Sequence, residues 1–370
     1  MILVACLNPA LDITHEVAAV DWAGINRPAA VHDRPGGKGL NVARTLHALG
    51  TDVLVTGLAG GITGAGVAAA LGVIGVRAAF TPVAGETRRT FTVVDGAVAG
   101  GTVAGGAVAG GQRRTAAFHE AGPAVSAAEF AAFLARYRAM LAGADAVVLS
   151  GSLPPGLPDG TYATLVEAAR AAGVPAVLDT HGEALRLGAA AGPAIVKPNL
   201  SELEALAGRS LSAGAAAGLA ADTDADAGLA PGADLAASAE PAAVADLAAV
   251  ADAARELCTA GAEAVVVTLG PDGLLAVTAD GGWRARPPAA VTGNATGAGD
   301  AVAAALAHGL VLGRPWDERL RHAAALGAAT AAAPVAGEFR GEDYLGTLGA
   351  VTVEQVPVAL PAEIPAEGVR

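Results

Sequence analysis

Residues 291–307, VTGNATGAGDAVAAALA, form a glycine-rich turn that runs directly into a helix of small apolar residues. A helix N-terminus that follows glycines exposes unpaired backbone N–H groups and a partial positive charge, which together suit an anion. Asp300 falls in the first turn of this helix, where a carboxylate can accept a proton from an attacking hydroxyl. The alternative is that Asp300 only complements the helix dipole.

Outward from this segment, short apolar runs alternate with longer helical patterns. The expected strands are residues 2–7, 53–58, 146–149, 176–179, 194–196, 264–269 and 274–277. The expected helices are residues 39–49, 126–141, 159–172, 201–207, 244–260, 298–312 and 316–333. Several strands are continuously apolar, as is typical of parallel strands that are covered on both faces. The pattern predicts an α/β fold, with a mostly parallel central sheet and helices on both faces.

Two regions break this alternation. Residues 12–34 and 86–120 contain shorter, more polar runs, which predict a small β lid on the main domain. Two low-complexity insertions are expected at 97–111 and 211–243, the second as a mobile surface segment. Residues 1–360 are predicted to form a single domain, followed by a loose tail over 361–370.

Composition excludes several classes of partner. The 370 residues carry a formal net charge of −13, which opposes nucleic acid or an anionic membrane as the main partner. The hydrophobic fraction of 53% comes mostly from Ala and Val, without a run of about 20 strongly apolar residues. The first residues lack the basic region of a signal peptide, so a cytoplasmic protein is expected. Two cysteines predict no disulfide framework, and seven scattered histidines predict no zinc site.

Lysine is scarce: of 23 basic residues only Lys38 and Lys197 are lysines. Both follow turn-forming residues, within GGKG at 36–39 and KPN at 197–199. A chain that uses arginine almost everywhere is expected to keep lysine where a compact ammonium is needed. The alternative is that both are chance survivors on the surface.

Residues 36–41, GGKGLN, form a second glycine turn into a helix. Gly37 allows close backbone approach, Lys38 supplies charge, and Asn41 offers both a donor and an acceptor. Asp12 lies just past the first strand, where open α/β sheets place ligands, and an acid there can bind sugar hydroxyls. A simple helix-initiating turn and an Asx-turn at Asp12 are the alternatives.

Two further segments carry charge at turns. Asn199 and Glu202 are three residues apart and share one helix face suited to a hydrated Mg²⁺, unless they only form a capping box. Arg88, within GETRR at 85–89, suits a phosphate, although solvated surface charge is the default interpretation. Residues 269–273 predict a strand–turn–strand connection. The chain contains no G-x-x-x-x-G-K-[ST] P-loop.

The order of these motifs adds a resemblance. The motifs, in chain order, are NPALD (8–12), GGKGLNVAR (36–44), GETR (85–88), SGSLPPG (150–156), KPNLSE (197–202), TLGPDG (268–273) and GAGD (297–300). The chain resembles the ribokinase-like carbohydrate kinases of the phosphofructokinase B type, and within them the 1-phosphofructokinase and tagatose-6-phosphate kinase branch. The resemblance covers about residues 1–208 and 246–358.

The resemblance implies a division of labour in a kinase that uses ATP and Mg²⁺. Asp300 would be the general base, and Gly297, Ala298 and Gly299 would form the anion hole. The implied sugar site takes hydroxyls and a phosphate: the hydroxyls at Asp12, Gly37 and Asn41, and the phosphate at Lys38 and Arg88. The implied nucleotide site has Asn199 and Glu202 ordering Mg²⁺ and phosphates through water, Lys197 nearby, and Thr268, Gly270 and Gly273 lining ATP.

The resemblance further implies phosphorylation of a ketose phosphate, with fructose 1-phosphate converted to fructose 1,6-bisphosphate as the expected reaction. Tagatose 6-phosphate or fructose 6-phosphate is the alternative acceptor, and a non-catalytic sugar-phosphate sensor is the alternative outside the enzymes. A homodimer through the lid is also expected. His119 stands where an asparagine-like residue is typical, and His15 replaces a tyrosine.

Overall fold

The computed structural model describes residues 1–96, 114–212, 245–288, 296–333, 335 and 337–357. The predicted insertion at 97–111 and the tail at 361–370 lie outside the described residues. The insertion predicted at 211–243 also lies outside them, except for its first two residues. Leu211 is buried in the core, and Ser212 pairs with Ala245 as an antiparallel bridge, so the chain is anchored as far as Ser212.

The central sheet has ten strands in the order β14-β13-β12-β11-β10-β9-β8-β1-β4-β5. The seven parallel strands are β1 (Ile2–Cys6), β4 (Val53–Ala59), β5 (Arg77–Pro82), β8 (Ala146–Ser150), β9 (Ala176–Asp179), β10 (Ile195–Val196) and β11 (Ala264–Thr268). The antiparallel edge is β12 (Leu274–Thr278), β13 (Gly281–Arg286) and β14 (Thr352–Val356). The predicted α/β class with a mostly parallel sheet is confirmed.

Helices cover both faces of this sheet, because its central strands are apolar on both sides. In β1, Leu3 and Ala5 belong to one core and Ile2, Val4 and Cys6 to the other. The first core is covered by α3 (Ala127–Leu141), α4 (Thr161–Ala171), α5 (Gly182–Ala190), α6 (Leu200–Ala207) and α7 (Leu247–Ala260). The second is covered by α1 (Lys38–Ala48), α2 (Gly61–Val73), α8 (Ala298–Val311) and α9 (Trp316–Ala332), with α10 (Gly341–Leu348) packed on α9.

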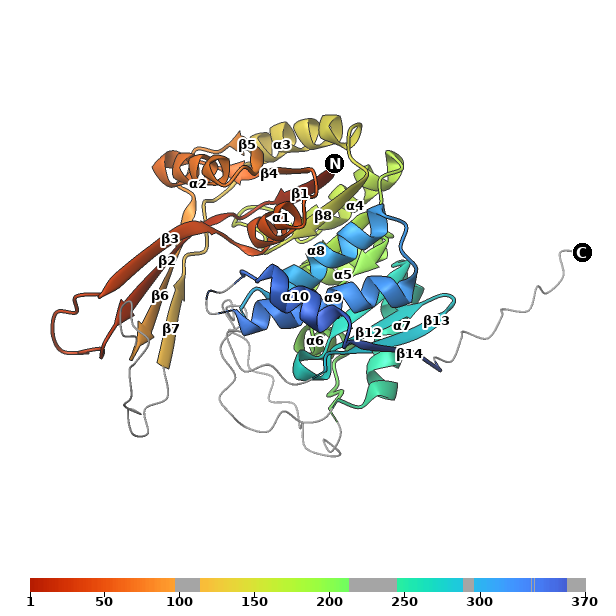
Figure 1. The fold of residues 1–370 in the computed structure, drawn as a ribbon. Helices are drawn as coiled ribbons and strands as arrows, with labels where there is room; N and C mark the ends of the chain where they lie inside the picture. The colour runs from red at the N-terminus through yellow and green to blue at the C-terminus, as the bar shows by residue number, and fades with distance from the viewer. Residues whose placement is uncertain (97–113, 213–244, 289–295, 334, 336, 358–370) are drawn as a thin grey trace, which may run out of the picture.

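A second sheet stands where the lid was predicted, and we call it the lid sheet. Its strands are β3 (Ala30–Gly36), β2 (Ala10–Val17), β6 (Arg88–Asp95) and β7 (Arg114–His119), in that order. β2 and β6 run parallel, and the other two pairs are antiparallel. Figure 1 shows these strands projecting to the left from the body of the molecule. Because β2 begins shortly after β1 and β3 leads into α1, the lid sheet joins the body close to the carboxyl end of β1.

The sequence pattern missed six elements: β5, β13, β14, α2, α5 and α10. In α2 the sequence GITGAGVAAALGV is apolar all round and contains four glycines, so no helical periodicity distinguishes it. The predicted helix at 244–260 begins instead at Leu247, because Asp246 caps it by accepting hydrogen bonds from Ala248 N and Ala249 N.

Among the described residues, no helix combines the length and the apolar character required to cross a membrane.

Candidate functional site

Polar residues gather at the carboxyl edge of the parallel strands. Asn8 follows β1, Asp179 ends β9, Lys197 follows β10, and Thr268 ends β11. Later strands of the chain extend the sheet on one side of β1, whereas β4 and β5 extend it on the other side. Open α/β sheets bind ligands at the carboxyl edge beside such a reversal of strand order, so this edge is the candidate site.

Two helices begin at this edge from glycines with positive φ. Gly37 precedes α1 with φ 93°, and Gly297 precedes α8 with φ 85°. A Cβ on Gly37 would lie 3.5 Å from the carbonyl oxygen of Asn8, so the backbone passes close to the end of β1. Since α1 and α8 pack against each other, their N-terminal N–H groups and positive dipole ends converge.

Asp300 lies in the first turn of α8 and is buried, with 6% of its surface exposed. Burial and the negative charge of Asp179 raise the pKa of Asp300 to about 7. The charges of Lys38 and Lys197 and a hydrogen bond from Asn41 oppose this rise. Asn41 Nδ2 donates that bond to Asp300 Oδ2 over 2.8 Å. A carboxylate with a pKa near neutrality is suited to accept a proton at physiological pH, which a dipole-complementing acid does not require.

Both lysines of the chain meet the same buried carboxylate. Lys197 Nζ lies 3.2 Å from Asp179 Oδ1, and Lys38 Nζ lies 3.9 Å from the same oxygen. Lys38 Nζ also lies 3.5 Å from Glu202 Oε1. Lys197 is buried and Lys38 half-buried, so the interpretation of both as surface survivors is wrong.

Arg88 and Lys38 were predicted to share the phosphate that is already on the sugar. Arg88 reaches in from β6, where its Nε donates to the carbonyl oxygen of Asn8 over 3.1 Å. Its Nη1 lies 3.5 Å from the carbonyl oxygen of Glu120, and no carboxylate of the described residues forms a salt bridge with it. Burial lowers the pKa of Arg88. Its guanidinium therefore suits an anionic ligand, whereas Lys38 points toward Glu202.

Asp12 lies within β2 rather than in a turn, and Thr90 Oγ1 donates a hydrogen bond to its Oδ1. A Cβ on Gly36 would overlap the Asp12 carboxylate, so the glycine before Gly37 leaves space for this side chain. Asp12 thus stands at the junction of the lid sheet and the body, close to the start of α1.

Asn199 and Glu202 form the capping box of α6. Asn199 Oδ1 accepts from Glu202 N over 2.7 Å, and Glu202 Oε2 accepts from Asn199 N over 2.9 Å. The capping interpretation is therefore confirmed, and Glu202 Oε1 faces Lys38 in addition. Among the described residues no group of three or more potential metal ligands occurs. A single carboxylate fits a hydrated Mg²⁺ that takes most of its ligands from water and nucleotide phosphates.

The remaining predicted nucleotide residues follow β11. Thr268 pairs with Asn199 as a parallel bridge, which aligns the end of β11 with the start of α6. Gly270 begins a short 3₁₀ turn (Gly270–Asp272), and Gly273, with φ 87°, leads into β12. The strand–turn–strand prediction is confirmed. The backbone of this turn flanks the edge at which Lys197 and Asn199 lie.

Asp179 is a residue of this site that the sequence interpretation missed. The strand at 176–179 was predicted, and its last residue is the acid. An acid at the carboxyl end of a parallel strand, the signal that pointed to Asp12, is present at Asp179 as well.

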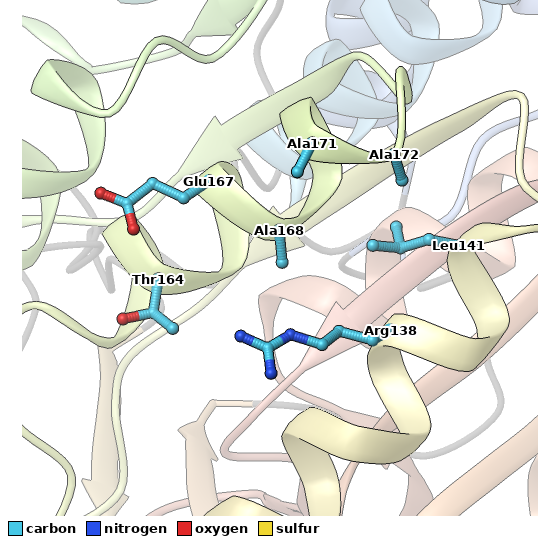
Figure 2. A pocket seen from close by; sticks show the side chains of 7 residues that line it. All are labelled: Arg138, Leu141, Thr164, Glu167, Ala168, Ala171 and Ala172. Carbon is cyan, nitrogen blue, oxygen red and sulfur yellow. The ribbon is translucent and has the colours of Figure 1, made fainter.

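The structure also has a groove of about 390 Å³ between α3 and α4 (Figure 2). It is lined by Arg138, Leu141, Thr164, Glu167, Ala168, Ala171 and Ala172. Both helices end near this groove and lead into the amino ends of β8 and β9. The groove therefore belongs to the edge of the sheet opposite the candidate site and contains none of its residues.

Comparison with known proteins agrees with this geometry. The profile of the pfkB family carbohydrate kinases matches residues 7–339. Phosphofructokinase-2 from Escherichia coli, in a structure with potassium, is 28% identical with a TM-score of 0.76, covering 94% of this chain and 97% of that chain. A structure described as a possible 1-phosphofructokinase from Thermotoga maritima is 25% identical with a TM-score of 0.73, covering 96% and 99%. A carbohydrate kinase from Agrobacterium tumefaciens, 20% identical with a TM-score of 0.67 over 96% and 99%, shares the fold.

Proposed function

Because the chain belongs to the pfkB family of carbohydrate kinases, we propose that it transfers the γ-phosphoryl group of ATP to a ketose phosphate, with fructose 1-phosphate as the acceptor. The observation that carries this proposal is Asp300, a buried carboxylate with a pKa near 7 in the first turn of α8. Transfer to a hydroxyl needs a base of this kind, whereas a binding protein does not.

The proposed reaction begins when the 6-hydroxyl of the sugar lies against Asp300. As the hydroxyl oxygen bonds to the γ-phosphorus, its proton passes to the Asp300 carboxylate and the bond from phosphorus to the ADP oxygen breaks. The backbone N–H groups of Gly297, Ala298 and Gly299 stabilise the charge on the transferring group. Glu202 would hold Mg²⁺ through water, and the ion would supply positive charge beside the nucleotide phosphates.

The sugar phosphate is proposed to enter from the lid side. Arg88, without a carboxylate partner among the residues described, takes the phosphate already on the sugar, and Asp12 and Asn41 hold hydroxyls. Lys38 lies beside Glu202 rather than beside Arg88, so its ammonium also stabilises the negative charge of the phosphoryl group that is being transferred. Tagatose 6-phosphate and fructose 6-phosphate also carry one phosphate group and several hydroxyls, so they remain the alternative acceptors.

The test is ADP release with Mg·ATP over fructose 1-phosphate, fructose 6-phosphate, tagatose 6-phosphate, fructose and a nucleoside. We expect fructose 1-phosphate to give the highest kcat/KM and Asp300→Asn to abolish the signal. A preference for one of the 6-phosphates moves the substrate assignment and retains the mechanism. A protein that binds ATP and sugar phosphate without turnover supports a sensor instead.

A homodimer through the lid sheet is proposed as well. Val31 on β3 and Phe118 on β7 lie on this sheet and expose 51% and 59% of their surface, which is apolar area that a second copy can cover. Light scattering after gel filtration tests it: Phe118→Glu should convert a dimer to a monomer, and a wild-type monomer contradicts the proposal.

A further inference from the structure

The two lysines of the chain converge on one acidic residue. Asp179 is buried, with 1% of its side chain exposed, and neither of its carboxylate oxygens accepts an aligned hydrogen bond among the residues that the structure describes. Its contacts with Lys197 at 3.2 Å and Lys38 at 3.9 Å are therefore ion pairs. A buried carboxylate without a counter-charge is costly, so these ammonium groups are what permits it there.

Lys197 places its charge at the start of α8. A Cβ on Gly299 would lie 3.6 Å from Lys197 Nζ, so the ammonium lies directly beside the backbone of the proposed anion hole. Lys197 is 3% exposed and cannot turn to solvent. The positive end of the α8 dipole and this ammonium thus act on the same small volume.

The second lysine is shared between two acids on neighbouring elements. Lys38 is the first residue of α1, whereas Glu202 lies in the first turn of α6. Asp179 stands at the end of β9, and both lysines face the same oxygen of its carboxylate, Oδ1. The four side chains of this cluster carry two positive and two negative charges, and the carboxyl group of Asp300 interacts with Asp179 and with both lysines.

We propose that Asp179 is a positioning residue for phosphoryl transfer, which fixes Lys197 beside the anion hole and holds Lys38 on the nucleotide side of the site. The inference rests on the proposed kinase function. Its physical basis is that a lysine ammonium is a point charge on a flexible stem, so its position is set by its partner. An asparagine at position 179 would retain the shape but lose the charge that orients both lysines.

The experiment compares Asp179→Asn with the wild type in steady-state kinetics and in ATP binding, both in the presence of Mg²⁺. We expect kcat to fall about 10²-fold, because correct placement of charged groups supplies much of the rate. ATP affinity should hold or improve, because a negative charge near the phosphates has been removed. A drop in ATP affinity that accounts for the whole loss of kcat/KM, with kcat unchanged, would overturn the proposal.

A pH profile gives a second readout. The groups that face Asp300 are Asp179 from β9, Lys38 and Asn41 from α1, and Lys197 after β10. Removing the Asp179 charge should move the acidic limb of kcat/KM to lower pH, because a carboxylate that raised the pKa of Asp300 is gone. An unmoved acidic limb would contradict the proposed coupling.

The matched control is Thr180→Val. Thr180 is buried next to Asp179, and its Oγ1 donates to the carbonyl oxygen of Gly151 over 2.9 Å. It should lower the melting temperature and leave the pH profile in place. If Thr180→Val reproduces the kinetics of Asp179→Asn, the role of Asp179 is only structural.

A double-mutant cycle with Lys197→Met tests the pair directly. If Asp179 acts through the lysines, the fall in kcat caused by Asp179→Asn should be at least about tenfold smaller in the Lys197→Met background than in the wild type. The reason is that the effects of substitutions at contacting residues are not additive. Additive effects would contradict the proposal. Failure of the proposed function looks different, since the wild type itself would then release no ADP with any sugar phosphate.

Discussion

The raised pKa of Asp300 suits its proposed role as a base, and it also makes ionisation of this side chain unfavourable to folding. Its pKa, about 7 against an ordinary value of 3.8, means that the folded protein holds this proton more tightly than the unfolded chain. As the pH rises from about 4 to 7, ionisation of Asp300 therefore becomes progressively unfavourable to folding. A carboxyl group with a pKa near 7 is partly ionised at neutral pH, which fits the proposed role of Asp300 as a base.

Asp300→Asn should therefore separate stability from activity. We expect kcat to fall by about 10²–10⁴-fold, because the base is lost. The melting temperature at pH 8 should rise, because a buried charge is replaced by a neutral amide of the same shape. Calorimetry at pH 8 and at pH 5 checks the sign: the gain at pH 8 should shrink at pH 5, where Asp300 of the wild type is mostly protonated. Wild-type turnover by this variant would refute the assignment of the base.

Asn41→Ala should shift the pH at which the enzyme becomes active. The hydrogen bond from Asn41 stabilises the ionised Asp300, so its loss should raise the pKa of Asp300 further. The acidic limb of kcat/KM should move to higher pH, opposite to the direction expected for Asp179→Asn. A shift to lower pH would mean that Asn41 does not stabilise the carboxylate.

At the scale of elements, α6 combines a structural and a chemical role in one capping box. Glu202 caps the helix with Oε2 and meets Lys38 with Oε1. Glutamine also serves at this position of a capping box, because its side-chain oxygen accepts the same backbone bond. The charge of Glu202 can therefore be removed without removing the cap.

Glu202→Gln should leave the melting temperature close to that of the wild type and weaken the response to Mg²⁺. We expect a several-fold higher Mg²⁺ concentration for half-maximal activity, since a carboxylate near the nucleotide phosphates is lost. Asn199→Ala is the comparison, because it removes the cap and should cost about 1 kcal/mol of stability. If Glu202→Gln keeps the wild-type Mg²⁺ dependence, Glu202 serves only the helix.

The helices and strands that could be predicted from the sequence are those with a clear hydrophobic periodicity or with turn residues at their ends. The parallel strands and the starts of α1 and α8 follow from apolar runs and glycine turns. The helix α2 escaped detection because small apolar residues lie all round it. The strands β13 and β14 escaped it because they lie at the edge of the sheet, where one pairs with the other across about 70 residues of chain.

The individual residues of the candidate site could be predicted from the sequence, but the contacts between them could not. Asp300, Lys197 and Glu202 each stand in a motif that local chemistry picks out. The ion pairs of Lys197 and Lys38 with Asp179 depend on how β9, β10 and α1 are placed in the fold, which brings together chain segments that no sequence spacing joins. The position of Lys38 beside Glu202 rather than Arg88 likewise depends on how α1 and α6 are placed.

At the scale of the whole molecule, two segments that are far apart in the sequence, at 211–212 and at 245–246, lie next to each other. Ser212 pairs with Ala245, and Asp246 N donates to the carbonyl oxygen of Leu211 over 2.9 Å. Ser212 and Ala245, the described residues on either side of 213–244, are therefore adjacent. A short connection can join them without moving α6 or α7.

Replacing residues 213–244 with a short Gly-Ser linker should leave the kinase folded and active. The expected result is a melting temperature near that of the full chain and unchanged kcat/KM. Leu211→Ala is the contrasting variant, because Leu211 is fully buried and its truncation should cost about 2–5 kcal/mol. Aggregation or inactivity of the shortened protein would show that the replaced segment contributes to the fold or to the site.

The scarcity of lysine has a practical consequence for anyone who handles this protein. Reagents that acylate amines find only the N-terminus, Lys38 and Lys197 on it, and Lys197 is shielded. Lys38 keeps 27% of its side chain accessible and belongs to the candidate site, so coupling a biosensor chip or a dye to this amine should interfere with that site. Because so few amines are present, acylation of Lys38 can be followed by mass spectrometry as a measure of nucleotide binding. Bound nucleotide that shields Lys38 should slow its acylation.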